Sequence, residues 1–280
     1  MADLRQGDWV VPGGLGLRTE LSVRGLRFAA AHRLVFERTD GHVPGIVFGR
    51  GEGGGHGNFH PLAWERICAN AGWARRLEKV HTASRRMRAR ADWQWKELDC
   101  AHSSDALLMN VFCFPGVMER AAVRAVLGVE ACAEPEFGVR MRTPLVGGTF
   151  DRTEVDMVVG ELLVEAKLTE SDFQRARAAL VMRYRDVEEV FHVEELPVRD
   201  GRHDGYQLVR GALAAYATGR SFCVLCDARR PDLMEGWYRI LRAVRVAELR
   251  CRLKMLTWQE LAAALPVELQ QFLATKYGIG

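Results

Sequence analysis

The chain has 280 residues, of which 48% are hydrophobic and 27% charged, and its net charge is +3 at pH 7. This is the composition of an ordinary globular protein that can bury a full core in one domain or in a pair of small ones. So small a net charge does not by itself require a polyanionic partner. The first 100 residues nevertheless hold 16 Lys and Arg against 11 Asp and Glu, a mild basic bias that permits contact with phosphate backbones.

No segment has the pattern of a membrane span or a secretion signal. The most apolar stretch, residues 106–118, is too short to cross a bilayer and contains Asn and Pro, and the N-terminus lacks the apolar core of a signal peptide. The seven cysteines are scattered and odd in number, which fits a reducing compartment. Cys223 and Cys226 form the one close pair, and two buried strand thiols are favoured over a zinc site because a second pair of ligands is missing. We expect a soluble, cytoplasmic protein without membrane contacts.

Two regions follow from the distribution of charge and periodicity. Residues 1–102 are predicted to form a basic, partly helical extension, with a Gly-rich stretch at 49–61 and helical periodicity over 60–98. The Gly-rich stretch lacks the spacing and the Lys-Ser/Thr pair of a phosphate-binding loop, so we interpret it as a connection rather than a phosphate cradle. Residues 103–280 are predicted to form the main domain, which ends in additional helices.

The main domain alternates helices and strands. Ser103, Ser104 and Asp105 are good helix caps in front of an apolar run, and Gly128 is a plausible C-cap for a second helix. The first expected helix runs from these cap residues to Pro115. The other expected helices cover 117–128, 171–191, 204–217 and 232–249, and a last one begins at a Thr257–Glu260 capping box. The expected strands cover 137–145, 155–159, 162–168, 221–227 and 253–256. Three successive strands after a helix predict an α/β fold whose mixed sheet has antiparallel members and helices on its faces.

The two central strands are joined by Gly160-Glu161, which suits a two-residue hairpin loop. Pairing about this loop sets Val159 against Leu162 and Asp156 against Glu165. One face of the hairpin is then wholly apolar (Val155, Met157, Val159, Leu162, Val164, Ala166 and Leu168), whereas the other carries Glu154, Asp156, Glu165 and Lys167, with Val158 and Leu163 near the turn.

The charged face of this hairpin has the groups needed for phosphodiester hydrolysis. Two directly opposed carboxylates, Asp156 and Glu165, repel each other unless something neutralises them. A divalent cation such as Mg²⁺ does so with one or two protein carboxylates, waters and substrate phosphate. Lys167 is then placed to orient or deprotonate a water, or to stabilise charge on the phosphate. The alternative is a solvated hairpin face with cross-strand ion pairs such as Glu154 with Lys167.

Asp156, eight intervening residues and the triplet Glu165-Ala166-Lys167 resemble the motif of the PD-(D/E)xK nuclease superfamily. The resemblance covers about residues 103–227. It implies a restriction-endonuclease-like core of order α-β-β-β-α-β. It also implies that Asp156, Glu165 and the Ala166 carbonyl bind Mg²⁺, with Mn²⁺ able to substitute, and that Lys167 serves the attacking water.

Further positions correspond to the superfamily less closely. Many members add an acidic residue from the first core helix, and Glu119 matches that place as either a ligand or a helix-edge residue. Asp151 is a rival first aspartate, and Val155 replaces the proline of the motif. Some branches have a Gln-x-x-x-Tyr motif after the lysine; here Gln207 is present, as a candidate nucleic-acid contact, but Gly211 stands where the tyrosine would be.

A dense basic segment at 75–96 offers contacts to phosphate beyond the hairpin. It includes Arg85, Arg86, Arg88 and Arg90 and interleaves them with two Trp residues; a charged amphipathic helix without a ligand is the alternative. Together these features predict a Mg²⁺-dependent endonuclease that acts on DNA rather than RNA. The second hypothesis is a catalytically inactive, nuclease-fold protein that binds nucleic acid or acts as a scaffold. A homodimer is compatible with cleavage of both strands, although no dimer signature is readable.

Overall fold

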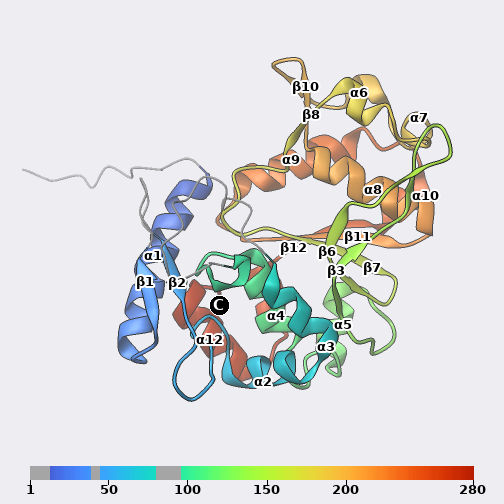
Figure 1. The fold of residues 1–280 in the computed structure, drawn as a ribbon. Coiled ribbons are helices and arrows are strands. Elements are labelled where there is room, and N and C mark those ends of the chain that lie inside the picture. Colours follow the sequence, from blue (N-terminus) through green and yellow to red (C-terminus); the bar gives the residue numbers. More distant parts are fainter. Residues whose placement is uncertain (1–12, 39–44, 80–95) are drawn as a thin grey trace, which may run out of the picture.

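The computed structural model describes residues 13–38, 45–79 and 96–280, and its centre is a five-stranded mixed sheet (Figure 1). The strand order is β12-β11-β7-β6-β3. β3, β6 and β7 pair antiparallel, whereas β7, β11 and β12 pair parallel. The strands cover Glu136–Arg140 (β3), Glu154–Val159 (β6), Leu162–Ala166 (β7), Ser221–Cys226 (β11) and Leu253–Thr257 (β12). The expected α/β fold with a mixed, helix-flanked sheet is thus confirmed.

The β6–β7 hairpin turns at Gly160-Glu161 and has the predicted register over its paired residues, with Val159 opposite Leu162 and Met157 opposite Val164. The ladder ends at this last pair, so the expected pairing of Asp156 with Glu165 is not part of it. Both of its faces are buried near the turn. Met157, Val159, Leu162, Val164 and Ala166 lie in one apolar cluster, whereas Val158 and Leu163 lie in a second one across the sheet.

One residue of the predicted apolar face departs from the alternation. Val155 packs in the second cluster, not with Met157. The β3–β6 ladder pairs Phe137 with Met157 and Val139 with Val155, so Gly138 lies between these pairs, opposite Asp156. Gly138 has a left-handed φ of 66°, which regular strand residues do not adopt, and the change of side coincides with this distortion.

The helix that connects the parallel strands β7 and β11 is α8, Tyr206–Thr218. A side chain on Gly211 would overlap the ring of Phe222 in β11, so this helix lies very close to the sheet. α8 occupies the place of the second helix in the α-β-β-β-α-β core, and the expected helix at 204–217 is confirmed.

The long helix predicted at 171–191 is wrong. Its residues form the short strand β8 (Arg175–Arg177) and two single-turn helices, α6 (Ala178–Val181) and α7 (Val187–Val190). β8 joins β9 (Val198–Arg199) and β10 (Arg202–Asp204) in a small sheet of order β8-β10-β9. Gln174 adopts a φ of 63°, which a right-handed helix does not allow. The buried side chains of this segment, such as Phe173, Val181 and Phe191, are therefore brought inward by an irregular path.

The remaining elements surround the sheet. They are α1 (Gly14–Ala31), β1 (Phe36–Arg38), β2 (Ile46–Phe48), α2 (Pro61–Ala69), α3 (Ala71–Ala74), η1 (Arg75–Glu78), η2 (Glu97–Asp99), α4 (Ser104–Phe112), α5 (Ala121–Leu127), β4 (Thr143–Pro144), β5 (Phe150–Asp151), η3 (Val193–Glu195), α9 (Pro231–Arg242), α10 (Ala247–Arg252), α11 (Trp258–Ala262) and α12 (Val267–Tyr277). The helix expected at 117–128 begins only at residue 121, and the one expected at 232–249 is divided into α9 and α10.

The predicted helix caps are present. Ser103 accepts a hydrogen bond from the backbone N–H of Ala106, Gly128 ends α5 with a φ of 65°, and Thr257 and Glu260 form a reciprocal capping box. Each cap satisfies backbone groups that the helix leaves without partners. Local sequence therefore determines where these helices begin or end.

The N-terminal elements pack on both the C-terminus and the main sheet region. α1 lies against α12, as Figure 1 shows, and Trp64, Leu98 and Met109 share a third apolar cluster. These contacts cross residue 102, and a domain boundary there stays a prediction. No helix in the described part of the chain is long and apolar enough to span a membrane. Cys223 and Cys226 are buried free thiols in β11.

The close approach of α8 to the sheet predicts a sharp contrast between two helical glycines. Gly211→Ala places a methyl group inside the ring of buried Phe222, and overpacking of this kind costs about 1–3 kcal/mol. Gly236→Ala in α9 meets Phe173 only at ordinary contact distance, 3.7 Å, and is expected to stabilise by roughly 0.5–1 kcal/mol through helix propensity. Thermal unfolding of both variants measures the difference; equal melting temperatures would contradict the close approach.

Candidate active site

The three residues of the hairpin motif lie together at one end of β6 and β7. Asp156 Oδ2 accepts a hydrogen bond from the backbone N–H of Ala166, 2.9 Å away. Glu165 Oε1 accepts one from Lys167 Nζ at 2.7 Å. The side chains of Glu165 and Lys167 are buried, with 3% and 5% of their residue surface exposed. A solvated hairpin face, the alternative considered from the sequence, is therefore wrong for these two residues.

The cross-strand ion pair between Glu154 and Lys167, part of the same alternative, is absent. Glu154 instead pairs with Arg76 from η1. The β6–β7 ladder ends at Met157 and Val164, whereas the backbone N–H of Lys167 still donates to the carbonyl of Leu225 in the parallel strand β11, at 2.7 Å. The parallel neighbour, which hairpin pairing alone does not include, thus sets the direction of Lys167.

A carboxylate that the sequence analysis did not select, Asp105, joins the cluster from the first turn of α4. It pairs with Arg76 Nη2 at 2.9 Å and with Lys79 Nζ at 2.5 Å. Asp105 is buried, and its charge acts on Asp156. The available signal was its position at the start of the helix expected before Pro115, where we considered it only as a cap former.

The mutual proximity of these charges shifts their pKa values. Burial, the charge of Glu165 and the charge of Asp105 hold the pKa of Asp156 well above its ordinary value. Burial also favours the neutral form of Asp105, but Lys79 and Arg76 outweigh it and lower the pKa of Asp105. For Lys167, burial is likewise outweighed, here by Glu165, Glu170 and Asp156, so the pKa of the lysine is raised. Lys167 is therefore a protonated, hydrogen-bond-donating ammonium near neutral pH.

Gln207, selected as a nucleic-acid contact, touches the motif directly. It lies in the first turn of α8, and its Nε2 donates to Glu165 Oε1 at 2.8 Å. Its Oε1 is buried without a hydrogen-bond partner among the described residues. Gly211 leaves no room for the tyrosine of the Gln-x-x-x-Tyr motif, since Phe222 fills that space. Glu170, another residue not selected, accepts from Ser104 Oγ at 2.5 Å and links the motif strand to α4.

Glu119 and Asp151 lie outside this arrangement. Glu119 is exposed, in the turn before α5, so the helix that forms from the segment expected at 117–128 does not include it. Its carbonyl accepts from Arg124. Asp151 is held in β5 by Thr153 and by the hydroxyl of Tyr184, which identifies it as a structural residue. Arg85, Arg86, Arg88 and Arg90 fall outside the described residues.

The ligands that this cluster offers suit a metal ion that is held partly by water, such as Mg²⁺, better than an ion held by protein side chains alone. Asp156 and Glu165 offer hard oxygen ligands, and Mg²⁺ typically uses one or two such carboxylates with several waters. The unpartnered Oε1 of Gln207 is an acceptor that a bound water would satisfy. Within the described ranges, no group of three or more His, Cys, Asp or Glu side chains is placed to hold a metal ion.

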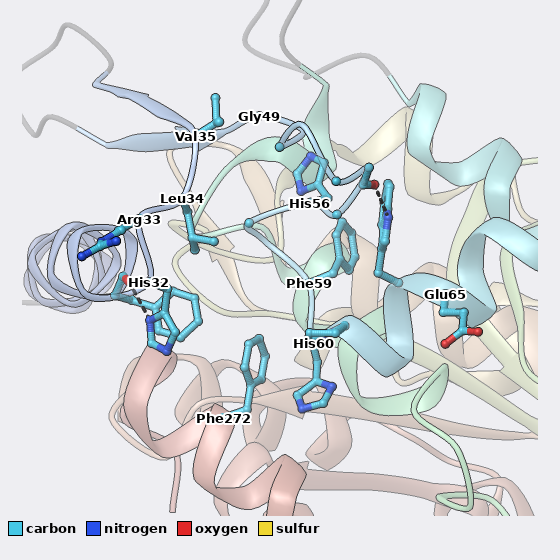
Figure 2. Close-up of a pocket in the computed structure, with 18 of the residues that line it drawn as sticks. His32, Arg33, Leu34, Val35, Gly49, His56, Phe59, His60, Glu65 and Phe272 are labelled. Carbon is cyan, nitrogen blue, oxygen red and sulfur yellow. Dashed lines mark hydrogen bonds between the residues drawn. The ribbon is translucent and has the colours of Figure 1, made fainter.

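A cavity of about 1260 Å³ lies away from this cluster, beside the Gly-rich loop (Figure 2). Its imidazoles have partners: His56 Nε2 meets Asp99 at 3.0 Å, and His60 Nε2 meets Glu268 at 3.3 Å. Within the loop, Gly51 and Gly54 donate their amides to loop carbonyls at 2.9 Å. These amides are therefore engaged, as expected for a connection rather than a phosphate cradle.

Residues 30–278 match the model of a family described as REase-ARP, restriction endonuclease associating with ARP. The chain belongs to this family. The match includes the whole sheet and the Asp156–Glu165–Lys167 motif, so the restriction-endonuclease-like relationship expected from that motif is confirmed. Membership supports a nuclease-like function. No curated protein and no solved structure matches the chain.

Opposite pKa shifts predict opposite effects of two matched substitutions in the metal-free protein. The raised pKa of Asp156 means that its ionisation destabilises the fold as pH rises from its unfolded-state pKa to its folded-state pKa. Asp156→Asn should therefore raise stability at pH 8 by about 1 kcal/mol, with a difference that vanishes at low pH. Asp105 has a lowered pKa, so its stabilisation is present above the unfolded-state pKa; Asp105→Asn should cost about 3–5 kcal/mol at pH 8.

Thermal melts in EDTA across the pH range measure both effects. Changes in melting temperature of the same sign for both variants at pH 8 would contradict the prediction that ionised Asp156 destabilises the fold whereas ionised Asp105 stabilises it.

Proposed function

We propose that the protein is a metal-dependent endonuclease that hydrolyses phosphodiester bonds in DNA. The observation that carries the proposal is the buried contact of Lys167 with Glu165, beside Asp156, at one end of the central hairpin. Burying these charges costs desolvation free energy that their mutual attraction need not recover, so the pair is better explained by a function than by its contribution to stability. Membership in a restriction endonuclease family supports the same conclusion.

In this proposal, Asp156, Glu165 and the Ala166 carbonyl hold Mg²⁺, with Mn²⁺ able to replace it. The ion, when bound, supplies an activated water and neutralises charge on the phosphate. Lys167 is protonated because of its raised pKa, so it donates a hydrogen bond to the attacking water or to a phosphate oxygen instead of accepting the proton. Gln207 orients Glu165 through their 2.8 Å contact.

Asp105 has a positioning role in this scheme. By pairing with Arg76 and Lys79, it retains two cations close to Asp156, and Arg76 Nη2 lies 3.9 Å from Asp156 Oδ1. Preorganised cations at a phosphoryl centre stabilise the charge that develops in the transition state. Both cations come from the N-terminal region, so the proposed site needs residues on each side of position 102.

The preference for DNA over RNA rests on the name of the family, restriction endonuclease associating with ARP. We also propose, from the same name, that the protein associates with a partner; formation of a homodimer is likewise a proposal. The competing function is nucleic-acid binding without catalysis on the same fold.

The decisive experiment is cleavage of plasmid and linear DNA with Mg²⁺, with Mn²⁺ and with EDTA. We expect metal-dependent nicking by the wild-type protein. Lys167→Ala and Asp156→Asn should each lower the rate by about 10²–10³-fold or more, because the first removes a cation that stabilises charge on the phosphate and the second removes a charged ligand of the proposed metal. Glu119→Gln is the matched control, since Glu119 is exposed and away from the hairpin. Binding without cleavage with either metal would favour the non-catalytic function.

Gln207 provides a test of the outer contacts of the site. Gln207→Leu keeps the approximate shape but removes the hydrogen bond to Glu165; loss of such a supporting contact typically costs about 10–100-fold in metal affinity or activity. The expected result is a higher metal concentration for half-maximal cleavage, with recovery at saturating Mn²⁺. An unchanged metal dependence would show that Gln207 does not orient Glu165.

A further inference from the structure

A row of three arginines crosses the small β8-β10-β9 sheet. Arg202 in the central strand is directly opposite Arg177 on one side and Arg199 on the other. Directly opposed residues in a sheet share a face, with Cβ atoms about 4.5–5.5 Å apart. All three arginines are exposed, whereas Ala176 and His203 in the next row are buried. The arginines therefore line the solvent-facing side of the sheet, and we refer to them as the arginine row.

The arginine row is only partly compensated. Arg199 pairs with Asp204 at 3.4 Å. Arg175, on the same face, pairs with Asp200 at 3.1 Å. In the described part of the chain, the side chains of Arg177 and Arg202 have no hydrogen-bond or ion-pair partner, and the face carries four arginines against two aspartates. Like charges in directly opposed positions destabilise a sheet, so this arrangement is costly unless an anion binds to it.

The arginine row is anchored next to the proposed active site. The segment that enters β8 crosses the start of α8: Gln207 donates its backbone N–H to the carbonyl of Phe173 at 2.9 Å, and Tyr206 donates to that of Gln174 at 3.0 Å. The ring of Phe173 lies 5.9 Å from Lys167 Nζ. β8 begins at Arg175, only two residues after this contact. The chain therefore passes directly from the contact beside Lys167 into the small sheet.

From this geometry we infer that the arginine row binds the phosphate backbone of the DNA duplex that the active site cleaves. The inference rests on the proposed function and assigns that function a substrate-binding surface. Adjacent strands are about 4.8 Å apart, so the guanidinium groups are distributed over roughly 10 Å and can contact successive phosphates. Arginine suits this role because its planar fork binds phosphate oxygens in pairs. Phosphate contacts position the duplex without reading its sequence.

The test is the salt dependence of binding of a labelled DNA duplex to the full chain in EDTA, where no cleavage occurs. Each phosphate contact contributes about 0.9 to the slope of log affinity against log salt. Arg177→Ala with Arg202→Ala should therefore make the slope shallower by about 2 and weaken binding about tenfold or more near 100 mM salt. Arg177→Lys with Arg202→Lys keeps the charges and should retain most of the affinity.

The matched control is Arg18→Ala with Arg27→Ala. Both residues are exposed on α1, far from β8 and β10 in Figure 1, and the control lowers the net charge by the same amount. An equal effect of the two alanine pairs would overturn the inference, as would an absence of duplex binding by the wild type. The inference would also be overturned if the alanine pair weakened the binding of an RNA duplex but not of a DNA duplex.

Thermal melting separates binding from folding. Removal of Arg202 relieves two like-charge contacts, so the alanine pair should melt at or slightly above the wild-type temperature; if it melts well below, Arg202→Gln alone replaces it in the binding assay. The arginine row and the proposed function fail separately. If the wild type never cleaves DNA but the alanine pair has the predicted shallower salt slope, the arginine row is supported and the nuclease function is rejected. If the wild type cleaves DNA but the alanine and control pairs have equal slopes, the nuclease function is supported and the arginine row is rejected.

Discussion

The hydrogen-bonded ion pair between Glu165 and Lys167 is the constraint on which the rest of the site depends. Both side chains are almost completely buried, so each needs a partner of opposite charge, and removing either would leave a buried charge uncompensated. The pair lies where the hairpin ladder ends and the parallel ladder with β11 continues. Its position therefore follows from sheet topology, and Asp156, Gln207 and Glu170 are arranged around it.

Charge balance explains why the cluster gathers residues from distant parts of the chain. Asp105 and Asp156 would repel each other and Glu165 in a site with Lys167 as the single cation. Arg76 and Lys79, supplied by the segment after α3, offset this repulsion at Asp105, whereas the pKa of Asp156 stays well above its ordinary value because of burial and the charges of Glu165 and Asp105. A bound cation would relieve that remaining repulsion, which is the electrostatic argument for a metal at this position.

Several elements were predictable because local signals determine them. The hairpin register follows from the two-residue loop and the side-chain period of two, and the Ser103 and Thr257 caps follow from their spacing to backbone donors. The helix predicted at 171–191 failed because its apolar residues match a helical period, whereas Gln174 and the pairing of β8 with β10 impose another path. The prediction that Glu119 lies on a core helix was wrong because α5 begins at Ala121, two residues after Glu119.

The sequence by itself determined the identities and the spacing of Asp156, Glu165 and Lys167, because a tight turn sets strand register within a few residues. It also determined that one face of the hairpin is apolar. Only the tertiary structure decided that the charged end is buried, that Asp105, Arg76 and Lys79 complete its charge balance, and that three arginines share one row of a small sheet. Those outcomes depend on contacts between residues far apart in the chain, and no local pattern specifies which distant residues meet.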